Sequence, residues 1–211
     1  MKRLRSLAGA ALTLGILMSL AGCVTPGPAT RAYLLTPTVA APASGIARPL
    51  APGAKRRTVV IRDLRLPQYL DRPQIVTRDE GNALGIVEHE QWGGPLREDM
   101  MRVLAINLGY LLDGDRVVAA PYPASGAPDY RVEVDIRSYE RQPGGRVVLA
   151  VQWWVTRGAD GSLHASAEAV FSGEPLPAGA GYDALVGSMS AVYGDLARAV
   201  ARSLRADEVR R

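Results

Sequence analysis

Two kinds of hydrophobic periodicity divide the second half of the chain into strands and helices. From residue 130 to residue 137 apolar and charged side chains alternate, which is typical of a strand with one face on a core and the other in water. The stretch 147–155 is apolar at nearly every position and predicts a central strand, and 163–171 predicts a third. Turn signals at Pro143-Gly144-Gly145 and Asp160-Gly161 separate the three. The pattern therefore predicts a three-stranded meander.

Apolar residues recur at the three- and four-residue spacing of a helix in one segment before this meander and in one after it. The first helix is predicted to open at Pro95, which suits a first helical position, and to end at Asp113-Gly114-Asp115. The second is predicted over residues 182–204. The apolar side chains on one face are Leu96, Met100, Val103, Leu104, Leu108 and Leu111 in the first helix, and Tyr182, Leu185, Met189, Tyr193, Leu196, Val200 and Leu204 in the second. Both helices are thus amphipathic and suited to cover a sheet.

Further strands are expected upstream of the first helix. The β-branched run 58–61 predicts a strand, and residues 75–77 and 84–87 predict a hairpin around a polar turn at 79–82. Together the elements predict an α+β domain over residues 58–206, followed by a short tail at 207–211. We expect a mostly antiparallel sheet with two helices packed on it, a two-layer sandwich.

The first 22 residues have the pattern of an export signal. A basic start with Lys2, Arg3 and Arg5 precedes an apolar run from residue 7 to residue 20. That run is shorter than the roughly 20 residues that a membrane-spanning helix needs. It ends in Leu-Ala-Gly-Cys, with the chain's only cysteine at Cys23. The other interpretation is an ordinary signal or a short membrane anchor, with Cys23 incidental.

The Leu-Ala-Gly-Cys ending is similar to the lipobox of bacterial lipoproteins. The resemblance implies cleavage after Gly22 and a diacylglycerol thioether on Cys23, and two or more acyl chains give long-lived membrane attachment. An aspartate at position 24 would resemble an inner-membrane retention signal, and Val24 stands there instead. We therefore expect the inner leaflet of the outer membrane, facing the periplasm, in preference to the inner membrane.

The segment 23–57 reads as a linker rich in proline and alanine. Such a composition cannot bury enough apolar surface to fold alone. Within it, residues 31–35 form a short apolar patch, Arg-Ala-Tyr-Leu-Leu, that is able to add an edge strand to the domain. In that case only the residues between Cys23 and Thr30 form the free tether, which holds the domain close to the membrane.

Composition and motifs indicate neither an enzyme nor a metal-binding or nucleic-acid-binding protein. After removal of the signal, 22 basic residues stand against 21 acidic ones, because three of the 25 lie in the signal, so no nucleic-acid footprint is expected. His89, His164 and Ser188 belong to no metal or nucleophile motif. The loose match to a dinucleotide motif at 179–184 lacks the parallel strand–helix–strand setting that the motif requires. We expect no enzyme and no cofactor apart from the covalent lipid on Cys23.

The run from Leu66 to Arg78, Leu-Pro-Gln-Tyr-Leu-Asp-Arg-Pro-Gln-Ile-Val-Thr-Arg, resembles the signature of the ABC-type transport auxiliary lipoproteins, the PqiC (YmbA-like) family. Trp92 and Pro95-Leu96 follow in the family's order. One departure is Glu90-Gln91, where a His-Arg pair is expected, and Gly93-Gly94 stands where Ala-Glu is expected.

This family resemblance implies a non-enzymatic partner of an MCE-domain protein, in a system that moves lipids or other apolar molecules between the two membranes. The implied role is to dock the periplasmic MCE channel to the outer membrane. The implied partners are the membrane, through the lipid anchor, and the MCE-domain protein, with a homo-oligomeric ring as a further possible assembly. The alternative function is a lipid-binding carrier with its own hydrophobic pocket, in which Trp153 and Trp154 either line that pocket or belong to the core.

The proline-bounded start of the signature is the candidate partner interface. Its residues are Pro67, Tyr69, Leu70, Asp71, Arg72 and Pro73. Flanking prolines lower the entropy lost when a loop is ordered, and tyrosine offers a large contact area with few rotors. The other interpretation, left open by the sequence, is that Tyr69 and Leu70 fold back and cap the domain's own core.

Overall fold

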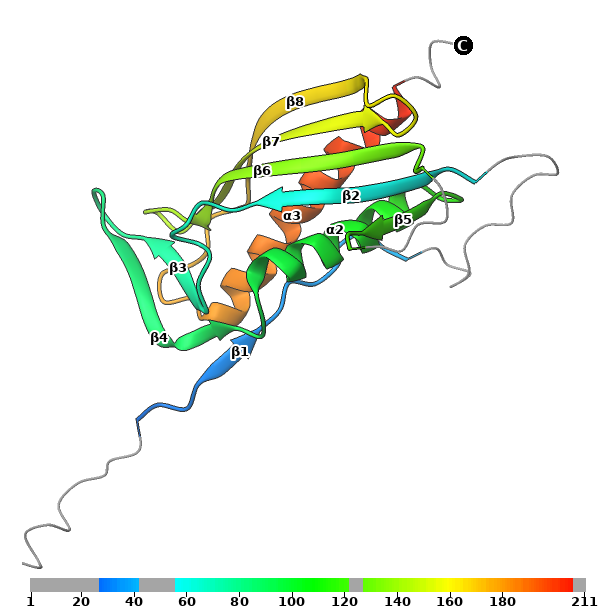
Figure 1. The fold of residues 1–211 in the computed structure, drawn as a ribbon. Helices are drawn as coiled ribbons and strands as arrows, with labels where there is room; N and C mark the ends of the chain where they lie inside the picture. Colours follow the sequence, from blue (N-terminus) through cyan, green and yellow to red (C-terminus); the bar gives the residue numbers. More distant parts are fainter. Residues whose placement is uncertain (1–26, 42–55, 122–126, 207–211) are drawn as a thin grey trace, which may run out of the picture.

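Eight strands form one mixed sheet, and two helices cover one of its faces (Figure 1). The structure, a computed structural model, describes residues 27–41, 56–121 and 127–206, so the signal segment and Cys23 lie outside the described residues. The elements in chain order are β1 (Arg31–Tyr33), β2 (Thr58–Arg65), β3 (Gln74–Arg78), β4 (Leu84–Trp92), α2 (Leu96–Leu111), β5 (Arg116–Ala119), β6 (Tyr130–Arg141), β7 (Val147–Arg157), β8 (Leu163–Ser172) and α3 (Tyr182–Arg205).

The sheet forks around its long central strand, β6. On one side of β6 the antiparallel strands β7 and β8 complete the predicted meander. On the other side β2 runs parallel to the first half of β6, and β3 pairs in parallel only with its last residue, through Thr77 and Arg141. Strand β5 extends the β2 branch, whereas β4 and then β1 extend the β3 branch.

The prediction of a mostly antiparallel sheet was wrong, because four of the seven strand pairs are parallel. The turn signals that predict hairpins join strands that are neighbours in the chain. Parallel pairs instead need a long crossover, and β2 and β6 are separated by β3, β4, α2 and β5. Strand β5 has only four residues and was not expected from the alternation pattern.

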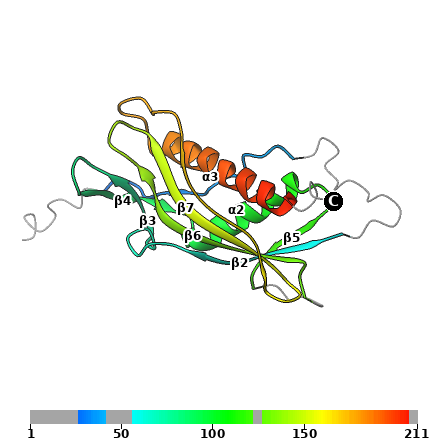
Figure 2. The same cartoon turned by 90° about the horizontal axis from the view of Figure 1, so that it is seen from above.

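The core lies between the sheet and the two helices, and the helices also contact each other (Figure 2). Two buried tyrosines tie the layers together. The Tyr139 hydroxyl on β6 donates to the Met189 carbonyl oxygen on α3 at 2.7 Å, and the Tyr193 hydroxyl on α3 donates to the Met100 carbonyl oxygen on α2 at 3.0 Å. Trp153 is buried on the helix side of β7, whereas its neighbour Trp154 points to the opposite face.

The chain after β1 crosses the helices on the side away from β6, β7 and β8 (Figure 1). Backbone amides of this arm donate to three side chains that are buried on the helices. The Leu35 amide donates to Asp99 at 2.8 Å, and the Thr36 amide to the Ser190 hydroxyl at 3.1 Å. Asn107 accepts from the amides of residues 38 and 39 at 3.2 Å each. The first part of the proline-rich segment is therefore bound to the domain, and β1 is an edge strand parallel to β4.

Candidate partner-binding groove

The segment from Leu66 to Pro73 links β2 to β3 and holds its shape with short-range hydrogen bonds. The Leu70 amide donates to the Pro67 carbonyl oxygen at 2.9 Å, and the Arg72 amide donates to that of Leu70 at 2.9 Å. Pro67 and Pro73 fix their own backbone φ angles on either side of these turns. We call this segment the signature loop.

The first half of the signature loop is anchored in the domain. Leu70 is 3% exposed and belongs to the hydrophobic core. Tyr69 is half-buried, and its hydroxyl donates to the Glu140 carboxylate at 2.7 Å. Burial, reinforced by the hydrogen bond and the charge of Glu140, raises the pKa of Tyr69 well above its ordinary value, so the phenol stays protonated. Leu70 thus matches the core-cap interpretation that the sequence left open.

Glu140 is the buried acceptor that organises this half of the loop. Its side chain is fully buried, and besides the Tyr69 hydroxyl it accepts hydrogen bonds from Arg78 at 3.0 Å, from the Gln142 side-chain amide at 2.9 Å and from the Tyr139 backbone amide at 2.8 Å. A buried charge is tolerated when it is paired and hydrogen-bonded in this way. The loop, β3 and the end of β6 are therefore joined through one carboxylate.

No local pattern in the sequence predicts the role of Glu140. Along β6 the inward side chains are Val132, Val134 and Ile136, and simple alternation places every even-numbered residue in the apolar core. The register shifts between Ile136 and Ser138, so that Tyr139 instead points toward the helices. A β-bulge of this kind re-aims the side chains that follow it. Glu140 then lies on the opposite face of β6 from Tyr139, where Tyr69 and Arg78 contact it and shield it from solvent.

The second half of the signature loop is open to solvent and lines a groove. Asp71 and Pro73 are exposed, and Arg72 is half-buried. The groove has a volume of about 360 Å³ and is lined by Asp71, Arg72, Pro73, Trp92, Gly94, Pro95 and Leu96. The buried side chains of Trp92 and Leu96 provide apolar contact at its base. The Trp92 amide donates to the Pro73 carbonyl oxygen at 2.7 Å, which joins the two walls.

The charges at the rim of this groove make no ion pair within the part of the chain that the structure describes. Asp71 makes no ion pair or side-chain hydrogen bond there. Arg72 makes one weak contact, from its Nε to the Gln74 side-chain oxygen at 3.3 Å. The two residues do not pair with each other. Both charges are therefore available to a molecule that enters the groove.

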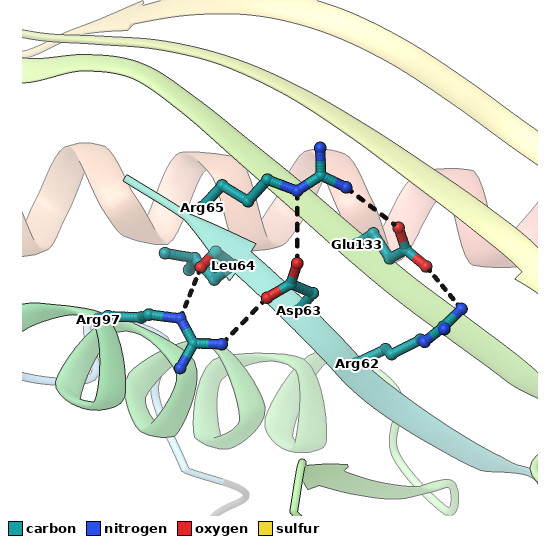
Figure 3. A network of polar contacts seen from close by, with 6 residues as sticks. All are labelled: Arg62, Asp63, Leu64, Arg65, Arg97 and Glu133. Carbon is teal, nitrogen blue, oxygen red and sulfur yellow. Dashed lines mark hydrogen bonds and ion pairs between the residues drawn. The ribbon is translucent and has the colours of Figure 1, made fainter. Parts of the chain in front are cut away.

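An ion network fixes the strand that leads into the signature loop (Figure 3). Arg97, in the first turn of α2, donates from Nε to the Leu64 carbonyl oxygen at 2.9 Å and from Nη2 to Asp63 at 3.0 Å. Arg65 contacts Asp63 at 3.3 Å, and Glu133 on β6 lies 3.8 Å from Arg65 and 3.1 Å from Arg62. Because α2 begins at Leu96 on one wall and β2 leads into the loop on the other, the network links the two walls of the groove.

The departure from the family pattern at Glu90 has a local structural role. Glu90 is 7% exposed, and it accepts a hydrogen bond from the Tyr33 hydroxyl at 2.7 Å. This contact runs beside the parallel pairing of β1 with β4. Glu90, which stands at the first position of the expected basic pair, therefore helps to fasten β1 to β4.

The remaining candidate residues do not converge. His89 lies on β4, 3.9 Å from Glu90, whereas His164 lies on β8 between the Tyr130 ring and the Ser203 carbonyl oxygen. Ser188 is on α3, close to Gly173. The described residues contain no group of three potential metal ligands. None of the helices described is both long and apolar enough to cross a membrane.

Comparison with known proteins points to one family and one fold. A family model for the ABC-type transport auxiliary lipoprotein component matches residues 33–201. No curated protein matches the chain. The crystal structure of an uncharacterized protein is similar with 19% identity and a TM-score of 0.65, over 84% of this chain and 99% of the other. A protein from Xanthomonas campestris is similar with 14% identity and a TM-score of 0.61, over the same shares. At these identities the two structures establish the fold alone.

Proposed function

Because the chain belongs to the family of ABC-type transport auxiliary lipoprotein components, we propose that it is a non-enzymatic outer-membrane lipoprotein that docks the periplasmic channel of an MCE-type transport system to the outer membrane. Membership in this family makes the chain a component of a transport system of the cell envelope. The lipids or other apolar solutes that the system carries pass through the MCE-domain protein rather than through this chain.

The groove beside the signature loop is the observation that carries this proposal. Partner-binding sites commonly combine an apolar centre that excludes water with a charged or polar rim. Trp92 and Leu96 supply the apolar centre, and Asp71 and Arg72 supply the rim. The occupant that we propose is an extended segment of the MCE-domain protein, with an apolar side chain on the base and charges complementary to Asp71 and Arg72.

The alternative of a lipid carrier receives less support from the fold. Trp153 and Trp154 were candidates to line a common hydrophobic pocket. They lie on opposite faces of β7, with Trp153 packed in the core and its indole nitrogen donating to the Ser203 hydroxyl at 3.1 Å. The two indoles therefore cannot enclose one ligand.

Membrane attachment in this proposal depends on Cys23, which lies outside the described residues. Replacement Cys23→Ser removes the thiol that would carry the lipid. We expect palmitate labelling to be lost and the chain to leave the membrane fraction. A labelled, membrane-bound Cys23→Ser protein would contradict the lipoprotein assignment.

The docking role is tested by affinity purification of the tagged, lipidated protein from detergent-solubilised membranes. We expect the MCE-domain protein of the same system to co-purify. Recovery of an intact, folded lipoprotein without any MCE-domain protein would reject docking. Lipid extraction from the same sample tests the carrier function, because a carrier should hold lipid in a stoichiometric amount.

A further inference from the structure

A second cleft lies among three connections between the strands and helices. It has a volume of about 530 Å³. Three connections form its walls: the start of the β3–β4 turn at 78–80, the β6–β7 turn at 141–145 and residues 176–179 between β8 and α3. This cleft shares no lining residue with the groove beside the signature loop.

The walls of this cleft are held by backbone contacts. The Leu176 amide donates to the Gly145 carbonyl oxygen at 3.0 Å, and the Gln142 amide donates to that of Arg146 at 2.8 Å. Gly145 has a φ of +84°, and a Cβ at this position would lie 2.6 Å from the Leu176 carbonyl oxygen. The close approach of two loops therefore depends on glycine here.

The cleft carries charges of both signs that have no partner among the residues described. Arg78 is committed to the buried Glu140. In contrast, the side chains of Arg141, Asp79 and Glu80 make no hydrogen bond or ion pair within residues 27–41, 56–121 and 127–206. Solvated charges are ordinary on a surface, but here one guanidinium and two carboxylates line the same concave space. Such a site matches a ligand that carries an anion and a cation a few ångströms apart.

The cleft also lies near β1, and this step rests on the proposed function, in which the lipid on Cys23 brings that end of the domain toward the bilayer. Burial raises the pKa of Tyr182, and the nearby positive charge of Arg141 opposes this effect. The Tyr182 ring in turn lies 6.3 Å from that of Tyr33, in β1. Since β1 begins only eight positions after Cys23, roughly 25 Å of extended chain connects it to the lipid.

We propose that this cleft binds the zwitterionic headgroup of an ethanolamine phospholipid at the membrane surface, with the phosphate on Arg141 and the ammonium on Asp79 and Glu80. Arginine is suited to phosphate because its planar fork can donate two hydrogen bonds. The apolar surface of the cleft is limited to Pro143, Leu176, Pro177 and Ala178, so the acyl chains remain in the bilayer. The site goes beyond docking of the MCE channel, because it orients the domain on the membrane.

Calorimetric titration of the full lipidated protein in detergent tests this site. The probes are short-chain dihexanoyl phosphatidylethanolamine, the corresponding phosphatidylglycerol, which lacks the ammonium, and inorganic phosphate. We expect the ethanolamine lipid to bind most tightly. Arg141→Gln should weaken its binding roughly tenfold, the effect of losing one charge-assisted hydrogen bond. The double variant Asp79→Asn/Glu80→Gln should weaken binding of the ethanolamine lipid and leave that of the glycerol lipid unchanged.

The matched control is Arg202→Gln, which removes the same charge from an exposed position in the last turn of α3. It should bind the ethanolamine lipid like the unmodified protein. Equal affinity for the ethanolamine and glycerol lipids, equal losses in the Arg141 and Arg202 variants, or no binding at all would each overturn the proposal. Co-purification of the MCE-domain protein should be retained in all these variants, which separates failure of this site from failure of docking.

Discussion

The two halves of the signature loop, only eight residues long, behave as different parts of the molecule. Tyr69 and Leu70 are fixed to the domain, one by the buried carboxylate of Glu140 and the other by the core. Asp71 and Arg72 follow directly, yet they point to solvent beside a groove and have no ion pair among the described residues. The anchored half makes the position of the free half reproducible. A partner that binds the free half therefore meets a loop that is already ordered, which lowers the entropy cost of binding.

The largest effect is expected from removing the acceptor that holds the anchored half. Glu140→Ala leaves the Tyr69 hydroxyl, the Arg78 guanidinium and the Tyr139 amide without their shared acceptor. Breaking a buried pair from one side costs about 3–5 kcal/mol of unfolding free energy. Chemical denaturation of the purified protein measures this loss. Glu174→Ala, at an exposed position, is the control and should change stability by less than about 0.5 kcal/mol.

Truncating the apolar anchor should have the next largest effect. Leu70→Ala removes buried methyl groups and leaves a cavity, which costs about 2–4 kcal/mol. The same change at Leu163, which is 58% exposed, should have little effect on the melting temperature. If Leu70→Ala melts like the unmodified protein, Leu70 does not anchor the loop and the contrast between the two halves fails. Binding of the Leu70→Ala variant to the MCE-domain protein, measured per folded molecule, should fall only modestly.

The anchored half also shows where inference from sequence reached its limit. Period-two alternation, a continuous apolar run and turn residues were enough to predict β6, β7 and β8, and helical spacing predicted α2 and α3 with ends within two residues of the observed ones. These signals are local, so they could not predict which distant strands pair in parallel. They also could not predict the surroundings of Glu140, because a bulge in β6 turns it away from the apolar core and its contacts come from Tyr69 and Arg78, which lie far away in the chain. The signature run itself was recognised by family resemblance, but its division into a buried and an open half depends on tertiary contacts.

A smaller effect is expected when the hydrogen bond of the anchored half is removed and the ring is kept. Tyr69→Phe loses the bond to Glu140, which keeps its other donors, so unfolding free energy should fall by about 1–2 kcal/mol at neutral pH. The raised pKa of Tyr69 also predicts a dependence on pH. The folded state holds this proton more tightly than the unfolded state, so its contribution is complete below the ordinary pKa of 10.0 and is lost as pH rises above it.

Denaturation midpoints measured from pH 8 to about pH 11 would show this difference. In Tyr69→Phe the alkaline decline should be shallower than in the unmodified protein. A residual decline should persist, because burial also raises the pKa of Tyr139 and Tyr193. A decline of identical steepness in both proteins would mean that Tyr69 is not held protonated by its surroundings.

The smallest effect on stability and the most direct effect on function are expected in the free half. Asp71→Ala and Arg72→Ala remove charges without a described ion pair, so each should change unfolding free energy by less than about 0.5 kcal/mol. Charged groups at the rim of an interface act on association and specificity more than on folding. Co-purification of the MCE-domain protein should therefore fall in both variants while their melting temperatures stay unchanged.

Charge reversal sharpens the test, since Arg72→Glu should impair binding more than Arg72→Ala if the partner presents a carboxylate. Arg62→Ala, an exposed arginine at the edge of the Figure 3 network, is the matched control and should bind normally. Normal binding by both rim variants would show that the open groove is not the docking site, even with the anchored half intact.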